Sequence, residues 1–148
     1  SDYLDVHSGL GPCGVLSLFQ TADEGEEAAD AARSWFPTVL RADRPGSSDP
    51  VTVGVLGPGL DDELAGTGSL VVPVVVEFGT RDVPEVFSAM RADNWLHNHG
   101  DPTSAVGERI RADMRDAFFV EDEGWRRAVA DDGLRTVRAA LDAVAAPP

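Results

Sequence analysis

The chain contains no lysine: all 12 of its positive charges are arginines, against 26 aspartates and glutamates, and its formal net charge is −14. Proteins that bind nucleic acids carry basic stripes that neutralise phosphates, and anionic membrane surfaces attract basic segments in the same way. The absence of lysine also excludes a phosphate-binding P-loop, whose glycine-rich turn ends in Gly-Lys-Ser/Thr. We therefore expect neither a nucleic acid nor a membrane as partner.

Cysteine and long apolar runs are equally scarce. Cys13 is the only cysteine, so the chain can form no intrachain disulfide and no thiolate cluster for zinc. No apolar run approaches the roughly 20 residues that span a bilayer. The first residues also lack the basic-then-apolar pattern of a signal peptide. These absences favour a cytoplasmic location, although the sequence does not determine the compartment.

The length of 148 residues and the hydrophobic content of 43% fit one globular domain with a real core. Apolar, largely β-branched runs predict strands, and amphipathic spacing predicts helices. The expected strands cover residues 3–6, 15–19, 51–56 and 70–76, and the expected helices cover 26–36, 83–100, 110–118 and 125–144. Strands that come first and alternate with helices predict the α/β class, with part of a mixed, largely parallel sheet flanked by helices.

Two segments resemble capping boxes, in which an N-cap side chain and an acidic residue three positions later hold a helix start. Thr21 and Glu24 form one box before the first expected helix, and Asp82 and Glu85 form the other, with Pro84 in the first turn. In the second helix we expect Val86, Phe87 and Met90 to share one apolar face.

Two apolar runs each end in one ionisable residue followed closely by glycine: Asp5-Val6-His7-Ser8-Gly9 and Val74-Val75-Val76-Glu77-Phe78-Gly79. Strands of α/β sheets deliver polar side chains to the sheet edge in this way, and such folds keep their sites there. An imidazole suits a metal ligand and a carboxylate suits a general base. We predict that His7 and Glu77 lie at the same edge of one sheet, on adjacent or next-adjacent strands.

Each of these residues also has a structural interpretation. A histidine at the end of a strand often makes only structural hydrogen bonds, and the strand before Glu77 could simply end at the surface. If Glu77 is buried, its charge costs several kcal/mol unless it is paired or neutralised, and burial raises its pKa. Asp5 lies two residues before His7, hence on the same face of a strand, where a carboxylate can orient a ligating imidazole.

Taken in order, several segments resemble the zinc carboxypeptidase-like metallopeptidase superfamily, which includes carboxypeptidase A, aspartoacylase and succinylglutamate desuccinylase. Asp5-Val6-His7-Ser8 is similar to the Asp-x-His-Ser segment of the carboxypeptidases. The closer resemblance is to an uncharacterised bacterial branch of this superfamily. It is carried by His7-Ser-Gly-Leu-Gly-Pro-Cys-Gly14, Glu77-Phe-Gly-Thr80, Arg91-Ala-Asp-Asn-Trp-Leu-His97, Arg115-Asp-Ala-Phe118 and Trp125.

The resemblance implies a zinc-dependent hydrolase of peptide or amide bonds that acts on a small peptide or an N-acyl amino acid. His7 would be the third zinc ligand, Asp5 would orient it, and Glu77 would be the catalytic base. Zinc would polarise the scissile carbonyl and lower the pKa of the attacking water. The loop from residue 57 to 68 would be a flap over the substrate, with the glycines Gly57, Gly59, Gly66 and Gly68.

The chain departs from the superfamily in lacking the His-x-x-Glu segment that supplies the first two zinc ligands. We therefore interpret residues 1–148 as the C-terminal portion of a single catalytic domain, which alone is expected to be inactive. Such a chain would associate with a missing N-terminal half. Two alternatives stay open: a non-catalytic binding module that keeps the fold, or one half of a hetero-complex. Tyr3 is the only tyrosine, so the loop before Glu77 lacks the tyrosine of classical carboxypeptidases.

Three other residues could carry chemistry. His97 and His99 form a His-x-His pair that could bind a metal, although near a helix end such a pair is more often a cap or a surface cluster. Cys13 could act as a nucleophile activated by His7, but a small residue packed in a turn explains it equally well.

Overall fold

The computed structural model describes residues 2–22, 25–41, 59–60, 63–64, 67–68 and 70–145. The strand predicted over residues 51–56 and two glycines of the predicted flap, Gly57 and Gly66, lie outside these residues.

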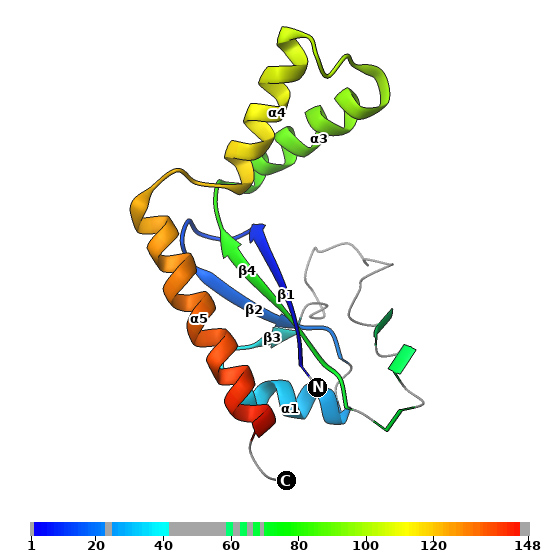
Figure 1. The fold of residues 1–148 in the computed structure, drawn as a ribbon, viewed down its shortest axis with the longest axis vertical. Helices are drawn as coiled ribbons and strands as arrows, with labels where there is room; N and C mark the ends of the chain where they lie inside the picture. Colours follow the sequence, from blue (N-terminus) through cyan, green and yellow to red (C-terminus); the bar gives the residue numbers. More distant parts are fainter. Residues whose placement is uncertain are drawn as a thin grey trace. The chain divides into compact units, whose positions relative to one another are not determined.

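The strands of the described part are β1 (Asp2–Gly9), β2 (Leu16–Gln20), β3 (Leu40–Arg41) and β4 (Val72–Gly79). They form one sheet in the order β1-β4-β2-β3 (Figure 1). β2 and β3 are parallel, with Phe19 opposite Leu40. The sheet is mixed and mostly parallel, and with its helices it confirms the predicted α/β class.

The longer helices of the described part are α1 (Glu27–Trp35), α3 (Val83–His99), α4 (Ala105–Phe118) and α5 (Glu123–Ala145). The predicted box at the start of α3 is confirmed, because the Asp82 side chain accepts a hydrogen bond from the Glu85 N–H at 3.0 Å. The box predicted for α1 is wrong. Its N-cap residue is Glu26, and among the described residues the buried Thr21 hydroxyl has no hydrogen-bond partner. Glu24, the other residue of the predicted box, lies outside the described residues.

The chain forms two compact units, each built from segments distant in sequence. One unit comprises Ser1–Val6, Ser17–Val76 and Asp132–Pro148, and the other comprises His7–Leu16 and Glu77–Asp131. In the first unit, Val72, Val74 and Val76 of β4 are buried. Ala22, Ala28 and Ala29 form a buried cluster in this unit, against which Leu70 packs. That residues 1–148 make up a single domain stays a prediction.

In the second unit, α3 and α4 pack against each other as a helical hairpin (Figure 1). Val86, Ala89 and Leu96 are the buried residues of α3. The apolar face predicted for this helix is only partly right, because Phe87 is 60% exposed and Met90 is exposed as well. The close turn before α4 explains Gly107, where an added Cβ would lie 2.4 Å from the Asp101 carbonyl oxygen.

None of the helices in the described part of the chain combines the length and the apolar composition needed to cross a bilayer.

Candidate functional site

His7 and Glu77 lie on neighbouring strands, as the sequence predicts. β1 and β4 are adjacent in the sheet, and each residue stands two positions before the end of its strand. Both strand ends belong to the same compact unit, and their arrowheads lie at the same end of the sheet (Figure 1). Both strands run further than expected, to Gly9 and Gly79, so the two residues sit inside the strands and not after them.

Glu77 is a buried carboxylate, 7% exposed. Its Oε1 accepts a hydrogen bond from the backbone N–H of Leu10 at 2.9 Å. Burial raises the pKa of Glu77, because desolvation penalises the charged form, while the Leu10 N–H and the charge of His7 act in the opposite direction. The carboxylate therefore sits in an environment that favours the neutral form but supplies one donor to the ionised form.

The backbone before Leu10 needs glycine. Gly9 has a φ of +149°, a conformation that side chains rarely adopt. An added Cβ there would lie 2.8 Å from the Phe118 ring and 3.7 Å from Glu77 Oε1. Gly9 thus leaves room for the Phe118 ring and lets the chain turn beside the carboxylate.

Gly79 anchors the turn between β1 and β2 to the end of β4. Its N–H donates to the Val15 carbonyl at 3.1 Å, and its carbonyl accepts from the Gly14 N–H at 2.9 Å. The same carbonyl accepts from the Trp125 indole N–H at 2.9 Å. An added Cβ would lie only 2.1 Å from the Pro12 carbonyl oxygen. The backbone turn and β4 therefore approach too closely for any side chain at this position.

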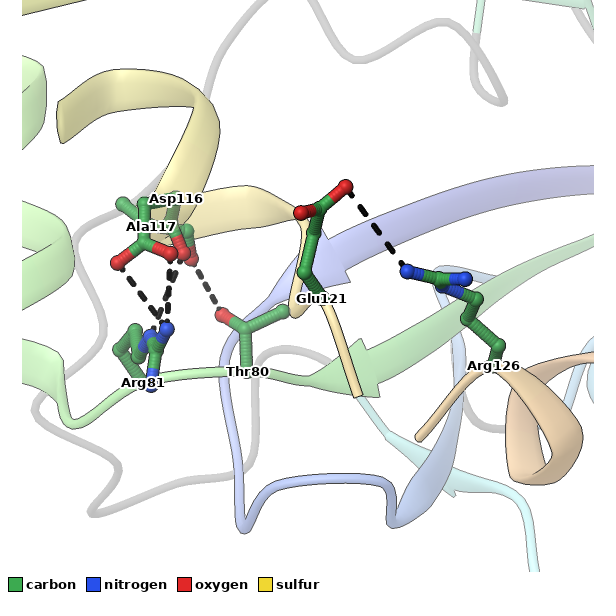
Figure 2. Close-up of polar contacts among 6 residues, drawn as sticks. All are labelled: Thr80, Arg81, Asp116, Ala117, Glu121 and Arg126. Atoms are coloured by element: carbon green, nitrogen blue, oxygen red, sulfur yellow. Dashed lines mark hydrogen bonds and ion pairs between the residues drawn. The ribbon is translucent and has the colours of Figure 1, made fainter. Parts of the chain in front are cut away.

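Two hydroxyls hold the C-terminal end of α4, where helix carbonyls lack partners within the helix. The Thr80 Oγ1 lies 2.6 Å from the Ala117 carbonyl oxygen, a contact drawn in Figure 2. The Ser8 hydroxyl donates to the Phe118 carbonyl at 2.7 Å. The last turn of α4 is thereby tied to the residues that flank His7 and Glu77 in sequence.

Arg81 adds a more exposed link to the same helix. Its Nη2 donates to both carboxylate oxygens of Asp116, at 2.9 and 3.0 Å (Figure 2). The two side chains are 36% and 63% exposed, so solvent screens much of their attraction.

The other residues predicted for the site differ in their exposure. The side chain of His7 is exposed, and Asp5 is half-buried in the part of β1 that belongs to the other unit. Of the predicted flap glycines, Gly59 and Gly68 would meet nothing within 4 Å if they carried a Cβ. Gly57 and Gly66 lie outside the described residues, so the flap stays a prediction.

All three histidines and the single cysteine lie within the described residues. Within these residues, no group of three or more His, Cys, Asp or Glu side chains is placed to hold a metal ion. His97 and His99 are exposed in the last turn of α3, and Cys13 is exposed in its turn. That His7 is a metal ligand stays a prediction.

An open groove of about 630 Å³ lies in the second unit, along α3 and the end of α4. Its lining includes Arg81, which is paired with Asp116, and the acidic residues Asp82, Glu85 and Asp113. Neither His7 nor Glu77 lines it, so the groove and the paired strand ends are separate features of this unit.

Sequence reasoning missed the contacts that hold Glu77. The donor to its carboxylate is the backbone N–H of Leu10, which no search for ionisable side chains can find. The indole donor to the nearby Gly79 carbonyl comes from Trp125, 46 positions after Gly79. The segment Glu77-Phe-Gly-Thr80 could have indicated these contacts, because a glycine and a hydroxyl residue follow the carboxylate within three positions.

Comparison with known proteins places the chain. No curated protein and no solved structure matches it. A family described as "Protein of unknown function (DUF2817)" matches residues 1–132, which include both strand ends, the α3–α4 hairpin and Trp125. The chain belongs to the DUF2817 family.

Proposed function

We propose that this chain is the C-terminal portion of a zinc-dependent, carboxypeptidase-like hydrolase of peptide or amide bonds. The observation that supports this best is the placement of Glu77. It is a buried carboxylate held by the Leu10 N–H, and the neighbouring strand carries His7 two positions from its end. An imidazole and a desolvated carboxylate on adjacent strand ends are the pair that the resemblance to zinc carboxypeptidases requires.

The donor set fits zinc only in part. His7 would hold the ion, and the resemblance assigns the other ligands to a missing N-terminal segment. The described residues contain no group of three potential ligands. When bound, zinc would supply Lewis-acid polarisation of the scissile carbonyl. Asp5 would orient the His7 imidazole from two positions earlier in β1.

Glu77 would move the proton. Its Oε1 is engaged by the Leu10 N–H, which leaves Oε2 to take a proton from the attacking water and pass it to the leaving amine. Burial, which raises the pKa of this carboxyl, makes it a better base than a solvated glutamate. The substrate would be a small peptide or an N-acyl amino acid.

The alternative is a binding module that keeps the fold without catalysis. The incomplete ligand set of the described residues favours it over a self-sufficient enzyme. A binding module would have the same fold and the same internal contacts as the hydrolase. The two alternatives differ only in whether Glu77 touches a reacting molecule.

Substitutions in a full-length form that supplies a His-x-x-Glu segment distinguish the hydrolase from the binding module. His7→Ala should lose zinc, whereas Glu77→Gln should keep zinc and lose amide hydrolysis by about 10²-fold or more, the usual contribution of a general base. His97→Ala, an exposed histidine on α3, is the matched control and should retain both. If Glu77→Gln keeps near-normal turnover with zinc bound, Glu77 is structural and the binding-module reading is favoured.

A further inference from the structure

Thr80 follows the Glu-Phe-Gly segment directly, and its hydroxyl faces two backbone carbonyls. It is 3% exposed. Its Oγ1 lies 2.6 Å from the Ala117 carbonyl oxygen and 3.0 Å from the Gly9 carbonyl oxygen. Because a hydroxyl carries one proton, the two acceptors share it, as in other three-centre hydrogen bonds. The Thr80 hydroxyl thus links the last turn of α4 to the Gly9 carbonyl at the end of β1.

The Gly9 carbonyl and the Leu10 N–H belong to one planar peptide group. Its oxygen accepts from Thr80, and its N–H donates to Glu77 Oε1 at 2.9 Å. Thr80 and Glu77 therefore hold opposite sides of the same rigid plane. Any rotation of this plane that weakens one hydrogen bond also weakens the other. The glycine conformation at Gly9 gives the plane the freedom to rotate, so a second constraint is needed to fix it.

We propose that Thr80 is a positioning residue: its hydroxyl fixes the Gly9–Leu10 peptide plane so that the Leu10 N–H holds the carboxylate of Glu77 in one orientation. The contribution to catalysis rests on the proposed function, but the positioning itself does not. Since Ala117 lies in the last turn of α4, the same hydroxyl makes the orientation of Glu77 depend on the seating of the α3–α4 hairpin.

The test is amide hydrogen exchange, read by NMR on the 148-residue chain without metal. Thr80→Val keeps the shape of the side chain and removes the hydroxyl. We expect the protection of the Leu10 N–H to fall at least tenfold and its proton resonance to move upfield. Thr80→Ser, which restores the hydroxyl, should return both to within about twofold of the wild type.

Thr136→Val is the matched control. Thr136 is 5% exposed, and its hydroxyl donates to the Asp132 carbonyl at 2.9 Å within α5, in the other unit. The control removes one buried hydroxyl that makes no hydrogen bond to the Gly9–Leu10 peptide. Any loss of global stability that it causes should lower the exchange protection of Leu10 and of the other slowly exchanging amides by the same factor. The proposal is overturned if Thr80→Val and Thr136→Val affect Leu10 equally after this correction.

A second measurement covers the case in which Thr80→Val does not fold. In the wild-type chain the Thr80 hydroxyl proton should be slow enough in exchange to be observed, with cross-peaks to the Leu10 N–H. A rapidly exchanging, unobservable hydroxyl would contradict the proposal.

In the intact enzyme, Thr80→Val should lower kcat about tenfold with zinc content and KM unchanged, and Thr80→Ser should restore kcat. If Leu10 responds as expected but the intact wild type hydrolyses no amide, the proposed function fails and the positioning role stands.

Discussion

Glu77 Oε1 and the Leu10 N–H are 2.9 Å apart, although the two residues are 67 positions apart in the sequence. This hydrogen bond joins the end of β4 to the turn after β1, beside a glycine that no larger residue can replace without strain. It places a buried carboxylate in a defined orientation instead of leaving it to the surrounding apolar residues. The consequences can be measured without knowing the substrate.

The first prediction concerns stability against pH. Burial raises the pKa of Glu77 in the folded chain above its unfolded value, so the folded state binds this proton more tightly. The favourable contribution of Glu77 is therefore fully present at pH below the unfolded pKa and is lost as the pH rises through the folded pKa. Glu77→Gln keeps an acceptor for the Leu10 N–H and cannot ionise. Its free energy of unfolding, relative to the wild type, should rise between pH 4 and pH 7.

The measurement is urea unfolding of both chains across this pH range, in which the contributions of the other acidic residues cancel in the difference. Glu85→Gln, in the exposed first turn of α3, removes one negative charge elsewhere and serves as the control. A stability difference between Glu77→Gln and the wild type that does not change with pH would contradict the prediction.

The second prediction concerns the close approach at Gly79. Gly79→Ala should lower the free energy of unfolding by about 2 kcal/mol or more, the range that overpacking costs. The added Cβ would lie 2.1 Å from the Pro12 carbonyl oxygen and 2.5 Å from the Gly11 carbonyl carbon, both backbone atoms. Gly59→Ala meets nothing within 4 Å and should stay within about 0.5 kcal/mol of the wild type. If the two substitutions lower the free energy of unfolding equally in urea, the backbone turn can move to accept a side chain and the prediction is wrong.

The third prediction concerns the indole of Trp125. Trp125→Phe keeps an aromatic ring beside Phe119, whose ring it meets edge-on at 5.4 Å, but removes the donor to the Gly79 carbonyl. That carbonyl keeps the Gly14 N–H, so the loss should be that of one ordinary hydrogen bond, about 1 kcal/mol. Circular dichroism in urea measures it without relying on tryptophan fluorescence. Trp95→Phe, at a side chain that is 49% exposed, should change little.

The sequence predicts where the helices and strands lie along the chain better than it predicts which face of each helix is buried. The β-branched run before Glu77 and the Asp82 box place the start of β4 and both ends of α3 within about two residues, because period and capping are local properties. The end of β4 lies three residues beyond the predicted one. The buried face of α3 depends on what packs against it, so Val86 is buried while Phe87 is exposed. The Thr21 box fails for a similar reason: a side chain able to cap a helix is not thereby placed to do so.

The same limit applies to the site. Two ionisable residues before glycine predict that His7 and Glu77 lie on adjacent or next-adjacent strands, and β1 and β4 are adjacent. The donor that holds Glu77 is a backbone group, and its orientation is set by the hydroxyl of Thr80 and by a glycine conformation. These depend on the course of the backbone through the turn, which composition and spacing do not specify.

The last prediction concerns zinc and the 148-residue chain by itself. All its histidines and its cysteine are described, and no three potential ligands converge in the described part. Complete structural zinc sites bind with roughly 10–16 kcal/mol of apparent free energy, whereas one imidazole with at most a nearby carboxylate leaves a tetrahedral site half empty. Calorimetric titration at pH 7 should therefore show weak binding or none, and His7→Ala should remove any residual signal that His97→Ala leaves intact. Tight, stoichiometric binding that survives His7→Ala and disappears in His97→Ala would move the metal to the end of α3 and remove the ground for pairing His7 with Glu77.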